Sequence, residues 1–263
     1  MNELSIGIAF SGGGHKGIAH AGVLKFLEEQ QIKPQIISGT SAGAIVGALY
    51  ANGKSSEDIL NLFQSVSFFN WNVFTTRKAG LFDIDRLEIY LDREFGNMVI
   101  GDLEKELYIS ATDMERGRLK IFGRDVLIKR AVLASCAFPG IFSPVTIDGR
   151  LYSDGGLLNN YPVTTIQGKC DFLIGCNVNP VVNLPQKSLK SIKSITLRSF
   201  EIMMMHYAQL YKNLCDWHIE PKELSHYFTF ETSKQRMEEI FEIGYNEAKN
   251  SFEFSEFEIK NKR

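Results

Sequence analysis

The feature that most constrains the fold is a junction in which a short apolar run passes directly into a helical one. Ile36 and Ile37 precede a Gly-Thr-Ser-Ala-Gly sequence at residues 39–43, and residues 42–49 are small and apolar. A Gly-x-Ser-x-Gly pattern between strand and helix is typical of a nucleophile elbow, a strained turn that projects the serine Oγ away from both elements. The following helix would direct free N–H groups and partial positive charge toward a developing alkoxide or oxyanion. The junction therefore favours an α/β fold with a reactive Ser41.

The glycines of this junction have an expected role. Gly39 and Gly43 are predicted where strand and helix pass so close that a Cβ on either residue would clash. The pattern alone is weak, because Ser41 could simply cap the N-terminus of the helix. Other parts of a site are needed to decide.

A second glycine cluster lies near the start of the chain. Residues 4–10 form a predicted buried strand, residues 11–17 a glycine-rich loop, and a helical pattern then runs to about residue 30. The spacing of Gly12, Gly14 and Gly17 matches the dinucleotide-binding fingerprint, so a nucleotide-binding module is the rival interpretation. That fingerprint requires an acidic residue at the end of the second strand, and residues 38–41 contain none. A Walker A loop is excluded, because Ile and Ala follow Gly17 where Lys and Ser or Thr are required.

The alternative is that the glycine loop stabilises an oxyanion. The backbone N–H groups of Gly12, Gly13 and Gly14 could approach a reacting carbonyl without obstruction by side chains. Lys16 would add positive charge or hold the loop through an ion pair. The loop and the elbow are expected side by side at the carboxyl ends of a parallel sheet, the usual place for a site in such folds.

A nucleophilic serine needs a base, and two kinds of residue could supply it. Of the five histidines, His206, His218 and His226 follow the serine in the chain order of a hydrolase triad, but none has a distinctive setting. Asp154 is more promising, since it follows a short strand-like run and precedes Gly155 and Gly156. A turn is the ordinary interpretation of such a segment. The passage nevertheless lacks the alternation of a hairpin, and paired glycines allow another loop to approach the carboxylate.

Taken together, these motifs resemble those of the patatin-like phospholipase family, and of its small bacterial members in particular. The glycine loop GGGHKG, the elbow GTSAG and the DGG motif occur in that family's order. The similarity continues through residues 111–114, 134–144 and 154–162, and so covers most of residues 4–180. The segment Ile-Glu-Pro at residues 219–221 and the closing helix are also similar to the small bacterial members.

The resemblance implies a fold, a dyad and an activity. The expected fold is a three-layer α/β/α sandwich around a mostly parallel sheet. Ser41 would be the nucleophile and Asp154 the base, with no metal or other cofactor. The remaining roles map onto an oxyanion loop of Gly12, Gly13, Gly14 and Lys16, and onto motif-supporting glycines, namely Gly17, Gly39, Gly43, Gly155 and Gly156. The implied activity is hydrolysis of lipid esters, of phospholipase A or lysophospholipase type, through an acyl-enzyme.

This dyad makes a chemical demand, because an aspartate with an ordinary pKa of about 3.9 is a poor base for a hydroxyl. We therefore expect burial to raise the pKa of Asp154.

Three alternative functions stay open: a soluble carboxylesterase or thioesterase, a nucleotide-binding module, and a non-catalytic interaction protein that retains the fold.

The whole chain sets further bounds. Its 263 residues are predicted to form one domain over 1–263, with a motif-bearing core at about 4–180 and a C-terminal strand and helices at about 190–250. A net charge of −2 argues against a nucleic-acid partner. The four cysteines are not closely spaced and no signal peptide is evident, which predicts reduced thiols in a cytoplasmic protein. Oligomeric state is not indicated.

The pattern also predicts individual elements and two lipid-facing candidates. Strands are expected near 4–10, 35–39, 107–112, 171–177 and 216–219, with shorter pieces near 118–122 and 144–153. Helices are expected near 16–30, 42–52, 56–67, 84–94, 125–135, 190–214 and 233–250. Residues 66–82 and 198–214 are rich in aromatic or methionine side chains that suit an acyl chain or transient contact with a membrane surface. Core packing or a subunit interface is the competing interpretation of each stretch.

Overall fold

The computed structural model describes residues 4–65, 80–82, 85–180, 182–227 and 233–253. Its main element is an eight-stranded sheet in which the order of strands is β10-β9-β1-β2-β4-β8-β7, with β5 paired to β4. The bounds are β1 Ile6–Phe10, β2 Ile36–Thr40, β4 Glu106–Asp113, β5 Arg118–Ile121, β7 Val145–Ile147, β8 Arg150–Asp154, β9 Phe172–Cys176 and β10 Trp217–Ile219. A separate parallel pair joins β3 Gly80–Phe82 to β6 Gly140–Phe142.

The sheet is mostly parallel, as predicted. Strands β10, β9, β1, β2 and β4 run in one direction, whereas β5, β7 and β8 form antiparallel pairs. Phe10 at the end of β1 is in register with Gly39 of β2 and with Cys176 of β9. The loops that leave these three strands therefore begin at the same edge of the sheet.

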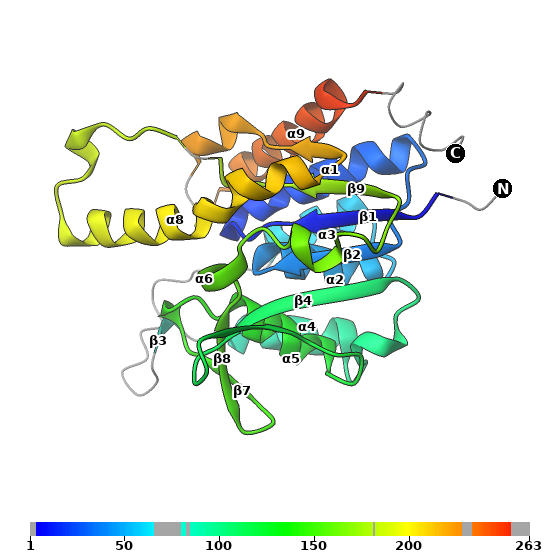
Figure 1. Ribbon diagram of the computed structural model, residues 1–263, viewed down its shortest axis with the longest axis horizontal. Helices are drawn as coiled ribbons and strands as arrows, with labels where there is room; N and C mark the ends of the chain where they lie inside the picture. The colour runs from blue at the N-terminus through cyan, green and yellow to red at the C-terminus, as the bar shows by residue number, and fades with distance from the viewer. Residues whose placement is uncertain (1–3, 66–79, 83–84, 181, 228–232, 254–263) are drawn as a thin grey trace.

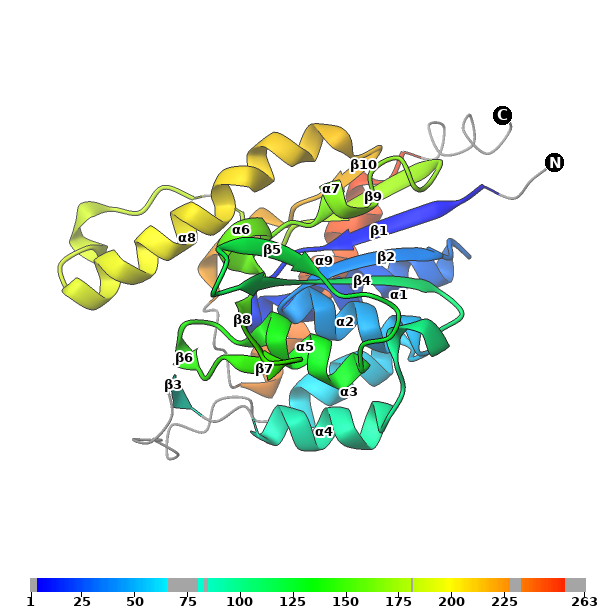
Figure 2. The same cartoon turned by 60° about the horizontal axis from the view of Figure 1, so that its bottom comes forward.

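Helices cover both faces of the sheet, which confirms the predicted three-layer α/β/α arrangement. Figure 2 shows α6, α7 and α8 on one face and α1 to α5 on the other. The bounds are α1 Ile18–Glu29, α2 Ala42–Ala51, α3 Ser56–Ser65, α4 Asp85–Phe95, α5 Ile128–Cys136, α6 Gly156–Asn159, α7 Val163–Ile166, α8 Ile192–Tyr211 and α9 Lys234–Ser251. Short 3₁₀ helices are η1 Gly14–Gly17, η2 Ile100–Asp102, η3 Gln186–Ser188, η4 Lys212–Leu214 and η5 Lys222–His226.

The central elements are apolar because they are enclosed on both sides. All five residues of β1 are buried, and nine of the ten residues of α2 are buried. Continuous apolar runs of this kind are typical of parallel strands covered by helices. They belong to one core that lies between the sheet and the helices α1 to α5 and α9.

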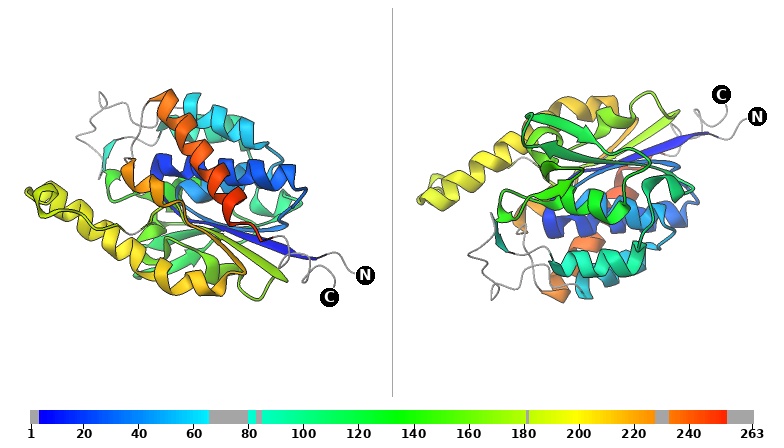
Figure 3. Two further views of the ribbon diagram at one scale, coloured as in Figure 1. Left: turned by 90° about the horizontal axis from the view of Figure 1, so that it is seen from above. Right: turned by 90° about the horizontal axis from the view of Figure 1, so that it is seen from below.

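The C-terminal helix α9 packs closely on α1 (Figures 1 and 3). A Cβ on Gly22 would lie 2.0 Å from the carbonyl oxygen of Phe241, and one on Gly244 would lie 2.1 Å from that of Ala19. The two backbones thus approach each other across a pair of glycines. Only residues without a Cβ allow this crossing.

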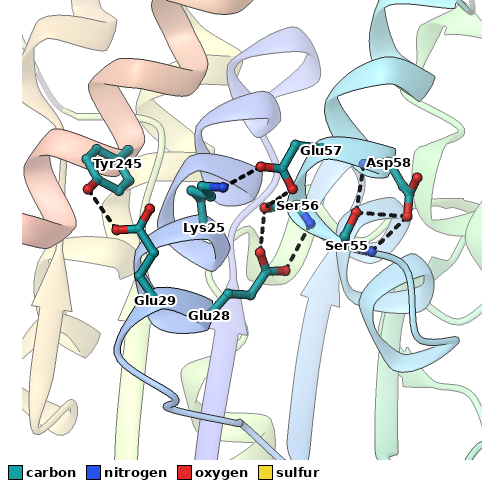
Figure 4. Close-up of polar contacts among 8 residues, drawn as sticks. All are labelled: Lys25, Glu28, Glu29, Ser55, Ser56, Glu57, Asp58 and Tyr245. Atoms are coloured by element: carbon teal, nitrogen blue, oxygen red, sulfur yellow. Dashed lines mark hydrogen bonds and ion pairs between the residues drawn. The ribbon is translucent and has the colours of Figure 1, made fainter.

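Polar contacts at the end of α1 join it to two other helices (Figure 4). The Glu28 carboxylate accepts hydrogen bonds from the backbone N–H of Ser56 at 2.9 Å and from its Oγ at 2.6 Å. A carboxylate at the first turn of α3 also suits the partial positive charge of a helix N-terminus. The hydroxyl of Tyr245 in α9 donates to Glu29 at 2.8 Å. Helix α1 is therefore held in place from both sides.

Most predicted elements are confirmed within a few residues, and the exceptions have local causes. The helix expected from residue 125 begins at Ile128, because Leu127 has extended backbone angles. Helices α6 and α7 were not predicted, since four residues are too few to show a periodicity. Of the aromatic stretch at residues 66–82, residues 66–79 lie outside the described residues.

The passage around Asp154 forms no hairpin about that residue, as expected, because β8 is followed by α6. The single strand-like piece expected near residues 144–153, however, is two strands. Strands β7 and β8 form an antiparallel hairpin whose turn contains Asp148 and Gly149, both with positive φ. Asp-Gly is a favoured sequence for such a turn. Asp154 is the last residue of the second strand of this hairpin.

Candidate active site

Ser41 occupies the strained turn that the sequence predicted. It lies between β2 and α2 with φ 53° and ψ −122°, outside the left-handed helical region. Its backbone N–H donates to the Oγ of Ser135 at 2.8 Å, a contact that sequence reasoning missed. A Cβ on Gly39 would lie 2.4 Å from the carbonyl oxygen of Gly43, and one on Gly43 would lie 2.3 Å from that of Phe10. The predicted close passage of strand and helix is confirmed.

The glycine loop lies directly against this serine. A Cβ built on Gly12 would be 3.2 Å from the Cβ of Ser41. Gly17 permits a similar approach, because its Cβ would be 2.6 Å from that of Ala42 at the start of α2. The loop after β1 and the elbow after β2 are thus side by side at the carboxyl edge of the sheet, as expected.

Hydrogen bonds fix the orientation of the loop. The Gly12 N–H donates to the carbonyl of Asn160 at 2.9 Å. The Gly12 carbonyl accepts from the Ser11 hydroxyl at 3.1 Å and from the side-chain amide of Asn179. Because a trans peptide is planar, the Gly12 C=O and the Gly13 N–H point in opposite directions, and these bonds also orient that N–H. Within the described ranges, the N–H groups of Gly13 and Gly14 donate to no other residue.

Asn179 is itself held by a second layer of contacts. The Asn177 Oδ1 accepts from the Asn179 backbone N–H at 3.2 Å, and the Asn177 Nδ2 donates to Glu220 at 2.6 Å. Sequence reasoning missed these residues. The available signal was the position of Asn177 and Asn179 immediately after the buried strand β9, at the edge where sites form in parallel sheets.

Asp154 is buried beside Ser41. The Asp154 side chain is almost wholly buried, and its Oδ1 accepts the Gly156 N–H at 2.7 Å. Its backbone is fixed on both sides, since its N–H donates to Ala137 at 2.9 Å and its carbonyl accepts from Thr112 at 2.8 Å. Burial raises the pKa of Asp154 to about 6, while the hydrogen bond from Gly156 and the nearby Ser41 hydroxyl oppose the rise. The expectation of a raised pKa is confirmed.

The glycines after Asp154 allow close packing around it. A Cβ on Gly155 would lie 2.5 Å from the carbonyl oxygen of Ser110, and one on Gly156 would lie 2.6 Å from the Cε of Met204 in α8. Cys136 is a further neighbour that the sequence did not single out. Burial and the charge of Asp154 raise the pKa of its thiol, so it stays protonated.

Residues 159–162 connect all three motifs. Besides the Asn160 contact to Gly12, the carbonyl of Asn159 accepts from the Thr40 hydroxyl at 2.9 Å. The carbonyl of Pro162 accepts from the Ser38 hydroxyl at 3.0 Å. The segment after the aspartate therefore binds the glycine loop and the strand that leads to the serine.

Lys16 is buried at the loop, next to α8. Burial lowers the pKa of its ammonium group, and the negative charge of Glu201 opposes that change. Glu201 is thus the charge that the structure places near this lysine. Phe200, its neighbour in α8, has its ring 5.9 Å from that of Phe138.

Two histidines near the site are engaged by other groups. The His20 ring lies 2.8 Å from the Ser11 carbonyl and 3.0 Å from the Cys176 thiol, and burial lowers its pKa to about 4. The Nδ1 of His218 lies 2.8 Å from the Tyr161 hydroxyl. Of the later histidines, His206 is exposed on α8 and His226 ends η5.

In the part of the chain that the structure describes, no three His, Cys, Asp or Glu side chains gather as metal ligands would. Among the same residues, no helix combines the length and the apolar character that crossing a membrane requires.

The fold and the site define an α/β protein with a serine elbow, a glycine loop and a buried carboxylate at one edge of its sheet. The family model for patatin-like phospholipases matches residues 8–166. The chain belongs to the patatin-like phospholipase family, which confirms the resemblance seen in the motifs.

Several relatives share this region. The chain is 32% identical over 189 residues to the uncharacterized protein R571 of Acanthamoeba polyphaga mimivirus, covering 64% of this chain and 63% of that protein. It is 32% identical over 187 residues to the uncharacterized protein YqhO of Bacillus subtilis, covering 59% and 64%. Lysophospholipase NTE1 of Eremothecium gossypii is 30% identical over 195 residues, or 69% of this chain and 12% of that protein. The chain thus spans less than two thirds of these relatives.

Solved structures show the same fold at low identity. VipD from Legionella pneumophila has a TM-score of 0.61 at 16% identity, covering 95% of this chain and 66% of that one. The type III effector protein ExoU has a TM-score of 0.52 at 16% identity, covering 99% and 54%.

Proposed function

We propose that this protein is a serine hydrolase of lipid acyl esters that uses Ser41 and Asp154 as a catalytic dyad. The observation that carries the proposal is a buried carboxylate, with its pKa raised to about 6, beside a serine on a strained elbow. An aspartate tuned in this way is ionised at neutral pH and is still basic enough to receive a proton in a transition state.

In the acylation step, the Ser41 Oγ attacks the ester carbonyl while its proton passes to Asp154. The C–O bond to the leaving alcohol then breaks, and Asp154 returns the proton to that alcohol. In deacylation, a water molecule gives a proton to Asp154 and attacks the acyl-serine, and the proton returns to Ser41 as the fatty acid leaves. Each step restores the charge of the dyad, so no cofactor is required.

The glycine loop would stabilise the oxyanion of both tetrahedral intermediates. The Gly12 N–H is already bonded to Asn160, so we assign the donor role to the N–H groups of Gly13 and Gly14. Gly12 would instead set the direction of the loop. One donor of this kind is typically worth about 3–4 kcal/mol of transition-state stabilisation. The positive charge of Lys16 would add to the potential at the loop.

The substrate class rests on the family and on the surroundings of the site. The chain belongs to a family named for phospholipases, and one relative is named a lysophospholipase. Apolar side chains of α8 and of the segment after α5 lie at this edge of the molecule: Met204 is beside Gly156, and the ring of Phe200 packs on that of Phe138. These side chains suit an acyl chain better than a polar acyl donor. A soluble ester or thioester with the same acyl group would fit the same chemistry.

The nucleotide-binding alternative has less support. In a dinucleotide site the glycine loop would bind a pyrophosphate with its N–H groups, whereas here the N–H of Gly12 is occupied. An increase in melting temperature with NAD or ATP would revive this alternative.

The test is labelling with a fluorophosphonate, which traps an activated serine, followed by intact mass and peptide analysis. We expect one adduct on Ser41 in the wild type and none in Ser41→Ala or Asp154→Asn. The same two variants should lose release of fatty acid from lysophosphatidylcholine. Ala at His206, His218 or His226 should retain most of both.

Each contrary outcome has a meaning. A folded His218→Ala variant without activity would replace the dyad by a triad. A folded wild type that neither reacts with the probe nor releases fatty acid would favour a non-catalytic interaction protein. Activity on short soluble esters or thioesters alone would move the substrate class away from lipids.

A further inference from the structure

Helix α8 has two faces with different surroundings. Its inner face covers the candidate site, since Phe200 contacts Phe138, Met204 lies near Gly156, and Glu201 lies close enough to Lys16 to affect the pKa of its ammonium group. Its N-terminal half extends beyond the rest of the molecule, at the end where β1 and β2 deliver the glycine loop and the elbow (Figures 1 and 3).

The outer face of α8 is apolar and exposed. Ile192 is 87% exposed, and Ile195, Ile202, Met203 and Leu210 are each more than half exposed. At 1.5 Å per residue, this stripe is about 27 Å long from its first to its last member. Together with Leu184 in the preceding loop, these residues make up six of the eleven large exposed apolar side chains in the described part of the chain. We call them the α8 stripe.

The charged residues around the α8 stripe are mostly basic. Residues 172–215 contain five basic residues and one acidic residue, Glu201, in a chain whose net charge is −2. Glu201 is paired with Arg198 at 3.1 Å. Lys187 and Lys190, at the projecting end of α8, are exposed. An apolar helical face bordered by lysines is the pattern of a helix that lies in the interface of an anionic bilayer.

We infer that the α8 stripe docks this protein onto anionic phospholipid membranes and so brings the Ser41 site close to the lipid surface. The role of this docking in substrate delivery rests on the proposed function, whereas the docking itself needs no catalysis. A second copy of the chain is the competing occupant of the stripe. The surplus of lysines disfavours that occupant, because the like charges of two such faces would repel.

The experiment measures sedimentation with vesicles of phosphatidylcholine alone and of phosphatidylcholine doped with phosphatidylglycerol. All proteins carry Ser41→Ala, so that the bilayer stays intact and binding is measured apart from turnover. We expect binding to the doped vesicles that weakens with added salt. The double change Ile192→Ser and Ile195→Ser should reduce the affinity by about tenfold or more. Lys187→Gln and Lys190→Gln should each reduce it by about fivefold.

The matched control is Ile89→Ser, which removes an equally large apolar side chain, 66% exposed, from α4 on the opposite face of the sheet. It should bind as the parent does. With Ser41 restored, the double Ile variant should cleave a short soluble ester at the wild-type rate but a vesicle-borne ester slowly. Failure of both cleavages in the wild type would overturn the proposed function and leave the docking result intact.

Two outcomes would overturn the docking inference. One is the absence of vesicle binding by the folded parent. The other is binding that the Ile192 and Ile195 changes leave unaltered. A parent that is dimeric, does not bind vesicles and becomes monomeric in the double Ile variant would assign the stripe to self-association.

Discussion

At the scale of single residues, the main feature of the site is a buried carboxylate whose ionised form the fold destabilises. Asp154 is buried beside Ser41, and burial raises its pKa from about 3.8 to about 6. The charged form is therefore destabilised in the folded protein. Under the proposed function, the same burial would make Asp154 a more effective base, so a loss of stability would accompany the gain in reactivity.

A first prediction concerns the pH dependence of activity. Only the ionised form of Asp154 can accept the serine proton, so kcat/KM for a soluble ester should rise with pH through about 6 and level off above it. The measurement is kcat/KM at constant ionic strength from pH 4.5 to 8, over the range in which the fold is intact. A kcat/KM that is already nearly level over this range, as a base with the ordinary carboxyl pKa of about 3.9 would give, would contradict a base with a raised pKa.

A second prediction concerns stability. Between the unfolded and the folded pKa values, the folded state binds more protons at Asp154, so the contribution of this group to stability grows as the pH falls below about 6. Asp154→Asn removes the buried charge. It should raise the free energy of unfolding at pH 8 by about 3 kcal/mol, with a gain that shrinks toward pH 5.

Urea denaturation at the two pH values checks this. Asp148→Asn is the matched control, because it changes an exposed aspartate in the hairpin turn, where Asn also tolerates a positive φ. It should leave stability nearly unchanged at both pH values. A destabilised Asp154→Asn protein at pH 8 would mean that the carboxylate serves the structure more than it strains it.

At the scale of elements, the glycine loop is held by the connection that follows β9. The Asn179 amide donates to the Gly12 carbonyl, the Asn177 Oδ1 accepts from the Asn179 N–H, and Glu220 accepts from the Asn177 amide. A loop of bare backbone has little of its own to fix its direction, since glycine allows many conformations. The segments that follow β9 and β10 therefore fix the direction of the loop.

A third prediction follows for Asn179→Ala. The Gly12 carbonyl would retain only the Ser11 hydroxyl, and the Gly13 N–H would lose its fixed direction. We expect kcat to fall by roughly tenfold to a hundredfold, with little change in KM, because an oxyanion donor acts on the transition state. Steady-state kinetics with a soluble ester measure both constants. Asn183→Ala, an exposed change in the same connection, is the control, and a wild-type kcat in Asn179→Ala would refute the positioning role.

The same scale shows what the sequence can and cannot predict. The elbow and the glycine loop were predictable because their spacing follows from close passages of backbone, at Gly39 and Gly43 for example. Asn179, Ser135 and Cys136 were missed as members of the site, because they reach it through the tertiary fold and carry no local pattern. The hairpin before Asp154 was missed although its Asp-Gly turn was a usable signal. Helices α6 and α7 have four residues each, which is too few for a helical periodicity to be seen in the sequence.

At the scale of the whole molecule, parts outside the family match complete the fold. The family model ends at residue 166, whereas β9 and β10 extend the sheet and α9 packs on α1. Helix α1 continues directly from the glycine loop and η1. The C-terminal helix therefore supports the element that carries the loop, by way of Gly22 and Gly244.

A fourth prediction tests this crossing. In Gly244→Ala, the added methyl group would lie 2.1 Å from the Ala19 carbonyl oxygen and would force the two helices apart. We expect the free energy of unfolding to fall by about 3 kcal/mol, at the upper end of overpacking effects. Asn246→Ala, an exposed change in the same helix, should have little effect. Equal stability of the two variants in thermal and urea unfolding would contradict the close crossing.

The carbonyl groups of residues 159–162 accept hydrogen bonds from the glycine loop and from β2. This arrangement suggests a way to monitor the folding of the protein. The groups that would react come from three distant segments, and one short stretch of backbone bonds to the other two. In the native fold, these bonds make the strain at the serine, the burial of the carboxylate and the orientation of the loop depend on one another. Chemical reactivity at Ser41 would therefore arise late and all at once during refolding. The extent of Ser41 labelling by a covalent serine probe, added at intervals during refolding, would then report when the native state has formed.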